Sequence, residues 1–149
     1  MITGRRRRQR GSELVEFAIS AVLLFILLFG IIEFSVALFD KATITNAARE
    51  GARTGILFRP SPRSTLAEDD AIRQAVERYA DAYLISLGGE AQMSIDIERV
   101  HLSGNSELTV GDEVIVTVTY PYRFLIVPDL IGNMGGTLNL SSTSVMRAE

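Results

Sequence analysis

The feature that most constrains this chain is an uncharged apolar run near its N-terminus. Sixteen residues from Phe17 to Ile32 carry no charge, and apolar residues resume after Glu33 as far as Phe39. At 1.5 Å per helical residue, about 20 to 23 such residues span about 30 Å, the thickness of the hydrocarbon core of a bilayer. A helix that is apolar on every side is rarely the core helix of a small soluble domain. The sequence therefore predicts a single membrane-spanning helix.

The charges of the chain are distributed unevenly about this helix. Residues 1–11 carry five arginines and no acid, a charge of +5, whereas the remaining residues carry ten basic and eighteen acidic side chains, a charge of −8. Arginines directly before a span hold that end of a protein in the cytoplasm, so we expect one pass with the C-terminal domain outside the cytoplasm. A basic block can also bind nucleic acid. Its position beside an apolar span favours the topological role, and no nucleic acid is expected as a partner.

The inventory of reactive side chains argues against an enzyme. The chain has no cysteine, and His101 is its one histidine, so thiolate nucleophiles and thiolate or histidine metal sites are not expected. Ser141, Ser142 and Ser144 fall in a predicted strand without a base beside them. The glycine-bearing stretches match neither a phosphate loop nor a dinucleotide fingerprint. We expect no catalytic activity, cofactor, metal or small-molecule substrate. We interpret His101 as a surface or turn residue, because its spacing identifies no partner for it.

A glycine before the span and a glutamate inside it form a second signal. The stretch from Gly11 to Phe17, GSELVEF, places Glu16 one turn into the apolar run. A carboxylate at membrane depth is costly and is treated as functional by default. An ordinary signal peptide is cleaved after its apolar run, so that the run is removed. Cleavage at Gly11 would come before the apolar run and would leave the helix on the mature protein. The alternative is an uncleaved signal anchor with Glu16 at the cytoplasmic interface, and the residues themselves leave both open.

This pattern resembles the processing signal of type IV prepilins, in which a glycine is followed by four residues, a glutamate and an aromatic residue. The resemblance implies that a membrane prepilin peptidase cleaves between Gly11 and Ser12 on the cytoplasmic side. It also implies that Glu16 pairs with the new amine of a neighbouring subunit's Ser12 and fixes the stagger between subunits. The helix surface that packs in the assembly is then expected to comprise Phe17, Leu23, Leu24 and Leu27.

A second acidic residue, Glu33, interrupts the apolar run near its far end. It lies seventeen residues beyond Glu16, about a quarter turn away at about 100° per residue, so the two carboxylates do not share a face. If the hydrocarbon core begins near Leu14, twenty residues bring Glu33 to the outer interface. A contact within a helix bundle is the alternative interpretation.

The chain beyond the span is predicted to continue as a helical stem over residues 40–58 and to end before Pro60. Asp40 and Lys41 are interpreted as marking the exit from the bilayer. Ala47, Gly51 and Gly55 recur every four residues and form a narrow strip that lets another backbone approach closely. The strip packs either against the sheet of the same chain or against a neighbouring subunit, and both interpretations stay open.

The sequence of the stem makes the resemblance to pilin-related proteins more specific. The sequences EF at 16–17, GIIE at 30–33 and NAAREGAR at 46–53 are similar to the TadE-like family of pilin-related proteins, within the tight-adherence (Tad/Flp) branch of type IV pilus systems. Because 138 residues follow Gly11, far more than in the short major Flp pilins, the resemblance implies a minor pilin or pseudopilin.

Partners and location also follow from the resemblance. The implied partners are the prepilin peptidase, other pilins or pseudopilins and the pilus assembly platform. The implied location is a bacterial inner membrane, with incorporation into a pilus and a contribution to assembly, adherence or secretion.

Residues 59–149 are predicted to form a small extracytoplasmic domain of the α+β class. The linker RPSPRS at 59–64 precedes a capping box made by Thr65 and Glu68, and Gly88-Gly89 ends the helix that follows. The acidic residues at 68–70 suit the N-terminal end of this helix better than a calcium site. Its apolar face repeats every three or four residues and is expected to comprise Ile72, Val76, Tyr79, Tyr83 and Leu87.

Three strands are predicted after this helix, at 93–98, 114–120 and 138–146, and they form an antiparallel sheet. The second strand is apolar on almost both faces. The apolar segment 123–130 is interpreted as a loop near the membrane surface or at a subunit contact, and a glycine-rich loop at 132–136 precedes the last strand.

The chain therefore divides into a cytoplasmic basic leader (1–11), a membrane and assembly helix (12–39), a helical stem (40–58) and the external domain (59–149). Two functions of different classes compete. One is a pilin-related assembly protein, in which the helix carries the function. The other is a signal-anchored binding or sensor module of an envelope complex, in which the surface of the domain carries it.

Overall fold

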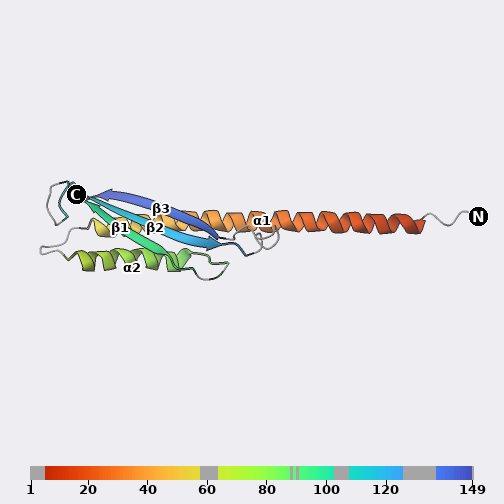
Figure 1. The fold of residues 1–149 in the computed structure, drawn as a ribbon, viewed down its shortest axis with the longest axis horizontal. Coiled ribbons are helices and arrows are strands. Elements are labelled where there is room, and N and C mark those ends of the chain that lie inside the picture. Colours follow the sequence, from red (N-terminus) through yellow and green to blue (C-terminus); the bar gives the residue numbers. More distant parts are fainter. Residues whose placement is uncertain are drawn as a thin grey trace, which may run out of the picture.

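A long helix carries a small α+β unit along its second half (Figure 1). The computed structural model describes residues 6–57, 64–87, 89, 91–102, 108–125 and 137–148. Its elements are, in chain order, helix α1 (Arg6–Gly55), helix α2 (Thr65–Tyr83) and strands β1 (Ser94–Val100), β2 (Glu113–Arg123) and β3 (Thr137–Arg147). The strands form one antiparallel sheet in the order β1-β2-β3. The predicted α+β class, the amphipathic helix and the three strands are confirmed.

Helix α1 divides into an uncovered first half and a second half that belongs to the core. Its 50 residues correspond to a length of about 75 Å, and only the part after about residue 33 runs alongside α2 and the sheet (Figure 1). Small buried residues at helical spacing line the covered part: Ala37, Ala47, Ala48, Gly51, Ala52 and Gly55. The helix ends at Gly55, before the predicted stop at Pro60.

The core lies between the sheet, α1 and α2. One face of β2 points into it through alternate residues, and these are Val114, Val116, Val118, Tyr120 and Tyr122. Ile72 and Val76 of α2 complete the cluster. The opposite face of β2 is half-buried and carries hydroxyl pairs across the strands, such as the pair of Thr117 and Thr143 at 2.9 Å.

Pro121 sits in the central strand without disturbing the sheet. Strand β1 begins at Ser94, which pairs with Thr119 of β2, so no residue of β1 pairs with β2 beyond Thr119. Pro121 therefore has only Asn139 of β3 beside it. A proline is tolerated where one side of a strand has no neighbour, because its missing N–H is not needed there.

Helix α2 begins and ends differently from the prediction. Its N-cap is Ser64, whose Oγ accepts a hydrogen bond from Ala67 N at 3.4 Å, so the predicted cap at Thr65 is wrong by one residue. The helix ends at Tyr83 and not at Gly88-Gly89. The backbone N–H of Ile85 bonds to a side chain of α1 and not to its own helix, which leaves Leu87 outside the helical face.

The narrow strip of α1 is occupied by the core of the same chain. A Cβ atom placed on Gly51 would lie 2.5 Å from Val76 Cγ2, and one on Gly55 would lie 2.9 Å from Val114 Cγ1. Ala47 is fully buried in the same cluster. These small residues therefore let α2 and β2 approach the helix axis closely.

Gly51→Ala tests this close approach. The added methyl group overlaps Val76 and should lower the free energy of unfolding by about 1–3 kcal/mol, against a gain in helix propensity of up to about 1 kcal/mol. Thermal unfolding of the full chain in detergent, followed by circular dichroism, measures the difference. Gly30→Ala is the matched control, because a Cβ at Gly30 meets nothing within 4 Å. A Gly51→Ala protein as stable as the control would contradict the packing.

Candidate functional site

The first half of α1 is a long apolar helix that the domain does not cover. The residues from Gly11 to Ile32 are exposed or half-exposed throughout. The helix is long and apolar enough to cross a membrane, and only 11% of its most apolar stretch is buried. A core helix of a soluble domain is mostly buried, so this half of α1 fits a membrane anchor.

The residues predicted for processing lie on this open helix. Gly11 and Ser12 are exposed, and a Cβ placed on Gly11 would meet no atom within 4 Å. Glu16 is also exposed and has no hydrogen bond or ion pair within the described part of the chain. Ser12 and Glu16 are one helical turn apart and so share a side of the helix. The structure thus leaves Glu16 available to a group from outside.

The apolar residues predicted for helix packing are all exposed: Phe17, Leu23, Leu24 and Leu27. At about 100° per residue, Leu23 and Leu27 lie within about 20° of Glu16 around the helix, and about 100° from Glu33, which faces the domain. This side of the helix is therefore turned away from the bulk of the domain. A neighbouring helix has access to it.

Glu33 joins the helix to the far end of β2. The residue is 3% exposed, and its Oε1 accepts a hydrogen bond from Leu125 N. The Tyr122 hydroxyl donates to the Glu33 carbonyl oxygen at 3.3 Å, and burial together with the nearby Glu33 raises the pKa of Tyr122. The ring of Tyr122 also packs edge-on against Phe124 at 5.1 Å. Of the predicted loop 123–130, residues 126–130 lie outside the described residues, as does the glycine-rich loop 132–136.

Asp40 and Lys41 extend this joint by two helical turns. Asp40 is fully buried, and its Oδ1 accepts a hydrogen bond from Ile85 N at 2.9 Å. Burial raises the pKa of its carboxyl group, and the bond from Ile85 opposes that rise. Lys41 Nζ donates to the carbonyl oxygen of Ser141 in β3. Asp40, predicted to mark the exit from the bilayer, thus holds the segment after α2 against α1.

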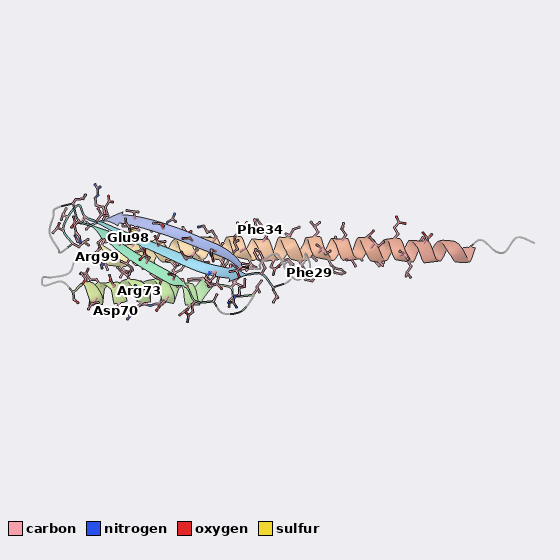
Figure 2. All side chains as sticks on the ribbon, in the orientation of Figure 1. Phe29, Phe34, Asp70, Arg73, Glu98 and Arg99 are labelled. Carbon is pink, nitrogen blue, oxygen red and sulfur yellow. The ribbon has the colours of Figure 1, made fainter. Side chains whose placement is uncertain are left out.

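The acidic start of α2 is bound by an arginine of the sheet. Arg99 Nη2 lies 2.5 Å from Asp69 Oδ1 and 3.7 Å from Glu68 Oε2, while Arg73 Nη1 donates to Ile95 O at 2.9 Å. Figure 2 labels Arg73 on α2 and Arg99 on the sheet that faces it. These contacts tie α2 to the edge strand β1. Among the described residues, no group of three or more histidine, aspartate or glutamate side chains is placed to hold a metal.

His101 has a partner that its spacing in the sequence did not identify. Its Nδ1 lies 3.3 Å from Oδ2 of Asp112, a fully buried residue. The Asp112 carboxylate also accepts hydrogen bonds from Thr109 N, Leu102 N and Thr109 Oγ1 at 2.8, 2.8 and 3.0 Å. The bond from the Thr109 backbone is the main cause that lowers the pKa of Asp112. The cluster fixes the turn before β2. His101 and Asp112 are eleven residues apart in the sequence, and this spacing matches no motif that would have predicted their contact.

The family comparison falls on the uncovered helix and the stem. The model of the family described as TadE-like protein matches residues 11–53. This segment is TadE-like. The match begins at Gly11 and includes the stem motif, so the resemblance predicted for this part of the chain is confirmed. The matched residues are thus similar to the helix and stem of TadE-like, pilin-related proteins. No curated protein and no solved structure matches the chain.

Acid should unfold the domain partly through Asp112. Because its folded pKa is lowered, its stabilising contribution is present above the ordinary pKa of aspartate and is lost as the pH falls through the folded value. Asp112→Asn should therefore be less stable than wild type at neutral pH and lose less stability on acidification. The loss begins as the pH falls below the ordinary pKa of aspartate, about 3.9, so thermal unfolding between about pH 7 and pH 2 measures both effects.

Glu113→Gln is the matched control for Asp112→Asn. Glu113 pairs with the exposed Arg147 at 2.9 Å, and exposed pairs contribute at most about 1 kcal/mol. Equal pH dependence in wild type and Asp112→Asn would contradict the role of the buried carboxylate.

Proposed function

We propose that this chain is a minor pilin or pseudopilin of a Tad (Flp) pilus system that a prepilin peptidase cleaves after Gly11. The observation that carries the proposal is where the family match lies along helix α1. The TadE-like match begins at Gly11, the predicted cleavage site, and runs along the uncovered half of α1 and on into the covered stem. The mature helix is the part that the chain contributes to the assembly, and the external domain is carried with it.

The one-sided packing of the domain supports an assembly role for the helix. The domain contacts one face of α1 and begins only at Glu33, so the preceding residues are open to neighbours. In a bilayer, helices associate through close packing and polar pairing and not through hydrophobic burial. Leu23 and Leu27 supply an apolar surface on the open side, and Glu16 supplies a polar group within about 20° of them around the helix.

Glu16 is proposed to set the register between subunits. Cleavage after Gly11 creates an ammonium group at Ser12, and pairing of that group with Glu16 of a neighbour relieves two desolvated charges. Removing one partner of a buried ion pair typically costs about 3–5 kcal/mol. Misregistered subunits lose that pairing, so the pair acts as a register device. Because the amine does not exist before cleavage, assembly follows processing.

The proposal also gives the orientation of the chain in the membrane and its role as a substrate. The five arginines before Gly11 hold the N-terminus in the cytoplasm of a bacterium until cleavage, and the domain lies outside the inner membrane. The chain is a substrate of a peptidase and is not itself an enzyme. Its external domain contributes to pilus assembly, adherence or secretion.

The intact mass of the protein from its native membrane tests the processing step. We expect the mass of a chain that begins at Ser12, and we expect Gly11→Ala to retain the arginine block. Gly30→Ala serves as the control for a glycine-to-alanine change elsewhere in the helix. A wild-type chain that still begins with the arginine block contradicts the proposal and favours a signal-anchored binding or sensor module.

Replacement of Glu16 separates processing from assembly. Glu16→Gln should be cleaved but should be lost from the pilus fraction, because the ion pair with Ser12 is missing. Glu13→Gln is the matched control, since Glu13 is also exposed on the first turns of the mature helix but does not occupy the position of the prepilin glutamate. If both variants enter the pilus as wild type does, the register role is wrong.

A further inference from the structure

Exposed apolar side chains lie on α1 and on the domain at the level where the domain begins. Phe34 and Leu38 of the helix are 58% and 56% exposed, and Leu125 and Leu138 of the domain are 53% and 40% exposed. Figure 2 places Phe34 at the end of the domain from which the uncovered half of α1 emerges. We refer to these four residues as the collar.

The collar lies on both sides of the helix. Leu125 bonds to Glu33 on the domain side, and Leu138 pairs with Tyr122, whose hydroxyl reaches the Glu33 carbonyl. Phe34 and Leu38 lie about 100° and 140° further around the helix from Glu33. A neighbouring helix would cover one side of α1, whereas the collar extends from the domain over about 140° of the helix at one height, which a lipid surface can cover in full. This arrangement favours lipid as the partner of the collar.

The height of the collar agrees with the thickness of a bilayer. If the hydrocarbon core begins near Leu14, Glu33 lies about 28 Å and Leu38 about 36 Å along the helix from that point. The core is about 30 Å thick, and the whole bilayer with its headgroups is about 40–45 Å thick. Glu33 therefore reaches the outer edge of the core, and Leu38 lies within the headgroup layer.

The charges at this height also suit a phospholipid surface. Both acids of the joint, Glu33 and Asp40, are buried and accept bonds from the backbone of the domain. Within the described residues 121–125 and 137–140 there is one charged side chain, the exposed Arg123. An arginine beside apolar residues can lay its stem along the apolar layer and keep its guanidinium at the phosphates.

We infer that, in the membrane-anchored form, the domain rests directly on the outer surface of the bilayer. Leu125 and Leu138 enter the headgroup layer, and Arg123 faces the lipid phosphates. Glu33 is a positioning residue, because its bond to Leu125 holds this end of the domain at a fixed height on the helix. The inference rests on the proposed membrane span, and its partner is a phospholipid surface.

Tryptophan fluorescence tests this placement, because the chain has no tryptophan of its own. Full-length Leu125→Trp is reconstituted into vesicles of phosphatidylcholine and phosphatidylglycerol that contain lipids brominated at shallow or deep positions. We expect the shallow quenchers to reduce its emission most. Leu24→Trp reports the span and should be quenched most by the deep lipids. Leu66→Trp, at the start of α2 and 77% exposed, should not be quenched.

The controls separate the failure of this inference from the failure of the span. If Leu24→Trp is quenched while Leu125→Trp behaves like Leu66→Trp, the placement of the domain is wrong and the span stands. If Leu24→Trp is not quenched either, the membrane span and the proposed function fail with it. Emission from Leu125→Trp that depends on the ratio of protein to lipid and not on bromination would assign the collar to a second copy and overturn the inference.

Glu33 variants of Leu125→Trp test the positioning role. Glu33→Ala removes the acceptor for Leu125 N, so quenching by shallow lipids should fall toward the level of Leu66→Trp. Glu33→Gln keeps a side-chain oxygen as acceptor and should restore the quenching. A merely structural contribution would lower thermal stability in both variants and leave the depth unchanged. Unchanged quenching in Glu33→Ala would therefore overturn the positioning role.

Discussion

The structure depends on one mismatch, because helix α1 is longer than its domain can cover. The domain packs on one face of the helix from Glu33 to Gly55, about 34 Å of its length. The 22 residues from Gly11 to Ile32 have no such cover. Small residues on the covered part let α2 and the sheet close around the helix, while large apolar residues dominate the uncovered part. The first set serves the chain's own core, and the second serves an environment outside the chain.

Buried carboxylates hold the irregular segments of the domain in place. Each of three acids accepts a hydrogen bond from a backbone N–H group that no strand or helix satisfies. Leu125 N donates to Glu33, Ile85 N donates to Asp40, and Leu102 N donates to Asp112. An unpaired buried N–H is costly, so each contact fixes one connection. Two of the three contacts attach a connection to α1. The domain should therefore follow the orientation of the helix, whether that helix lies in a bilayer or in a pilus.

The part of this architecture that local patterns encode was predictable from the sequence. The apolar run, the alternation in β2 and the helical spacing of Ile72 and Val76 each lie within one element. The contacts between distant segments were not predictable, since Glu33 and Leu125 are separated by 92 residues and an acid bonded to a backbone N–H leaves no spacing pattern. For the same reason, the end of α2 at Tyr83 was missed, because the hydrogen bond that Ile85 N donates to Asp40 redirects the chain before the glycine pair.

The central claim is that the uncovered half of α1 spans a membrane and the covered half stands outside it. The absence of native cysteine allows a direct measurement with single cysteines at Leu24, Leu27, Asn46 and Arg49 in the full chain in native membranes. A membrane-impermeable maleimide applied from outside should label Asn46→Cys and Arg49→Cys, both exposed beyond the joint, and leave Leu24→Cys and Leu27→Cys unlabelled. Equal labelling at all four positions would contradict the account.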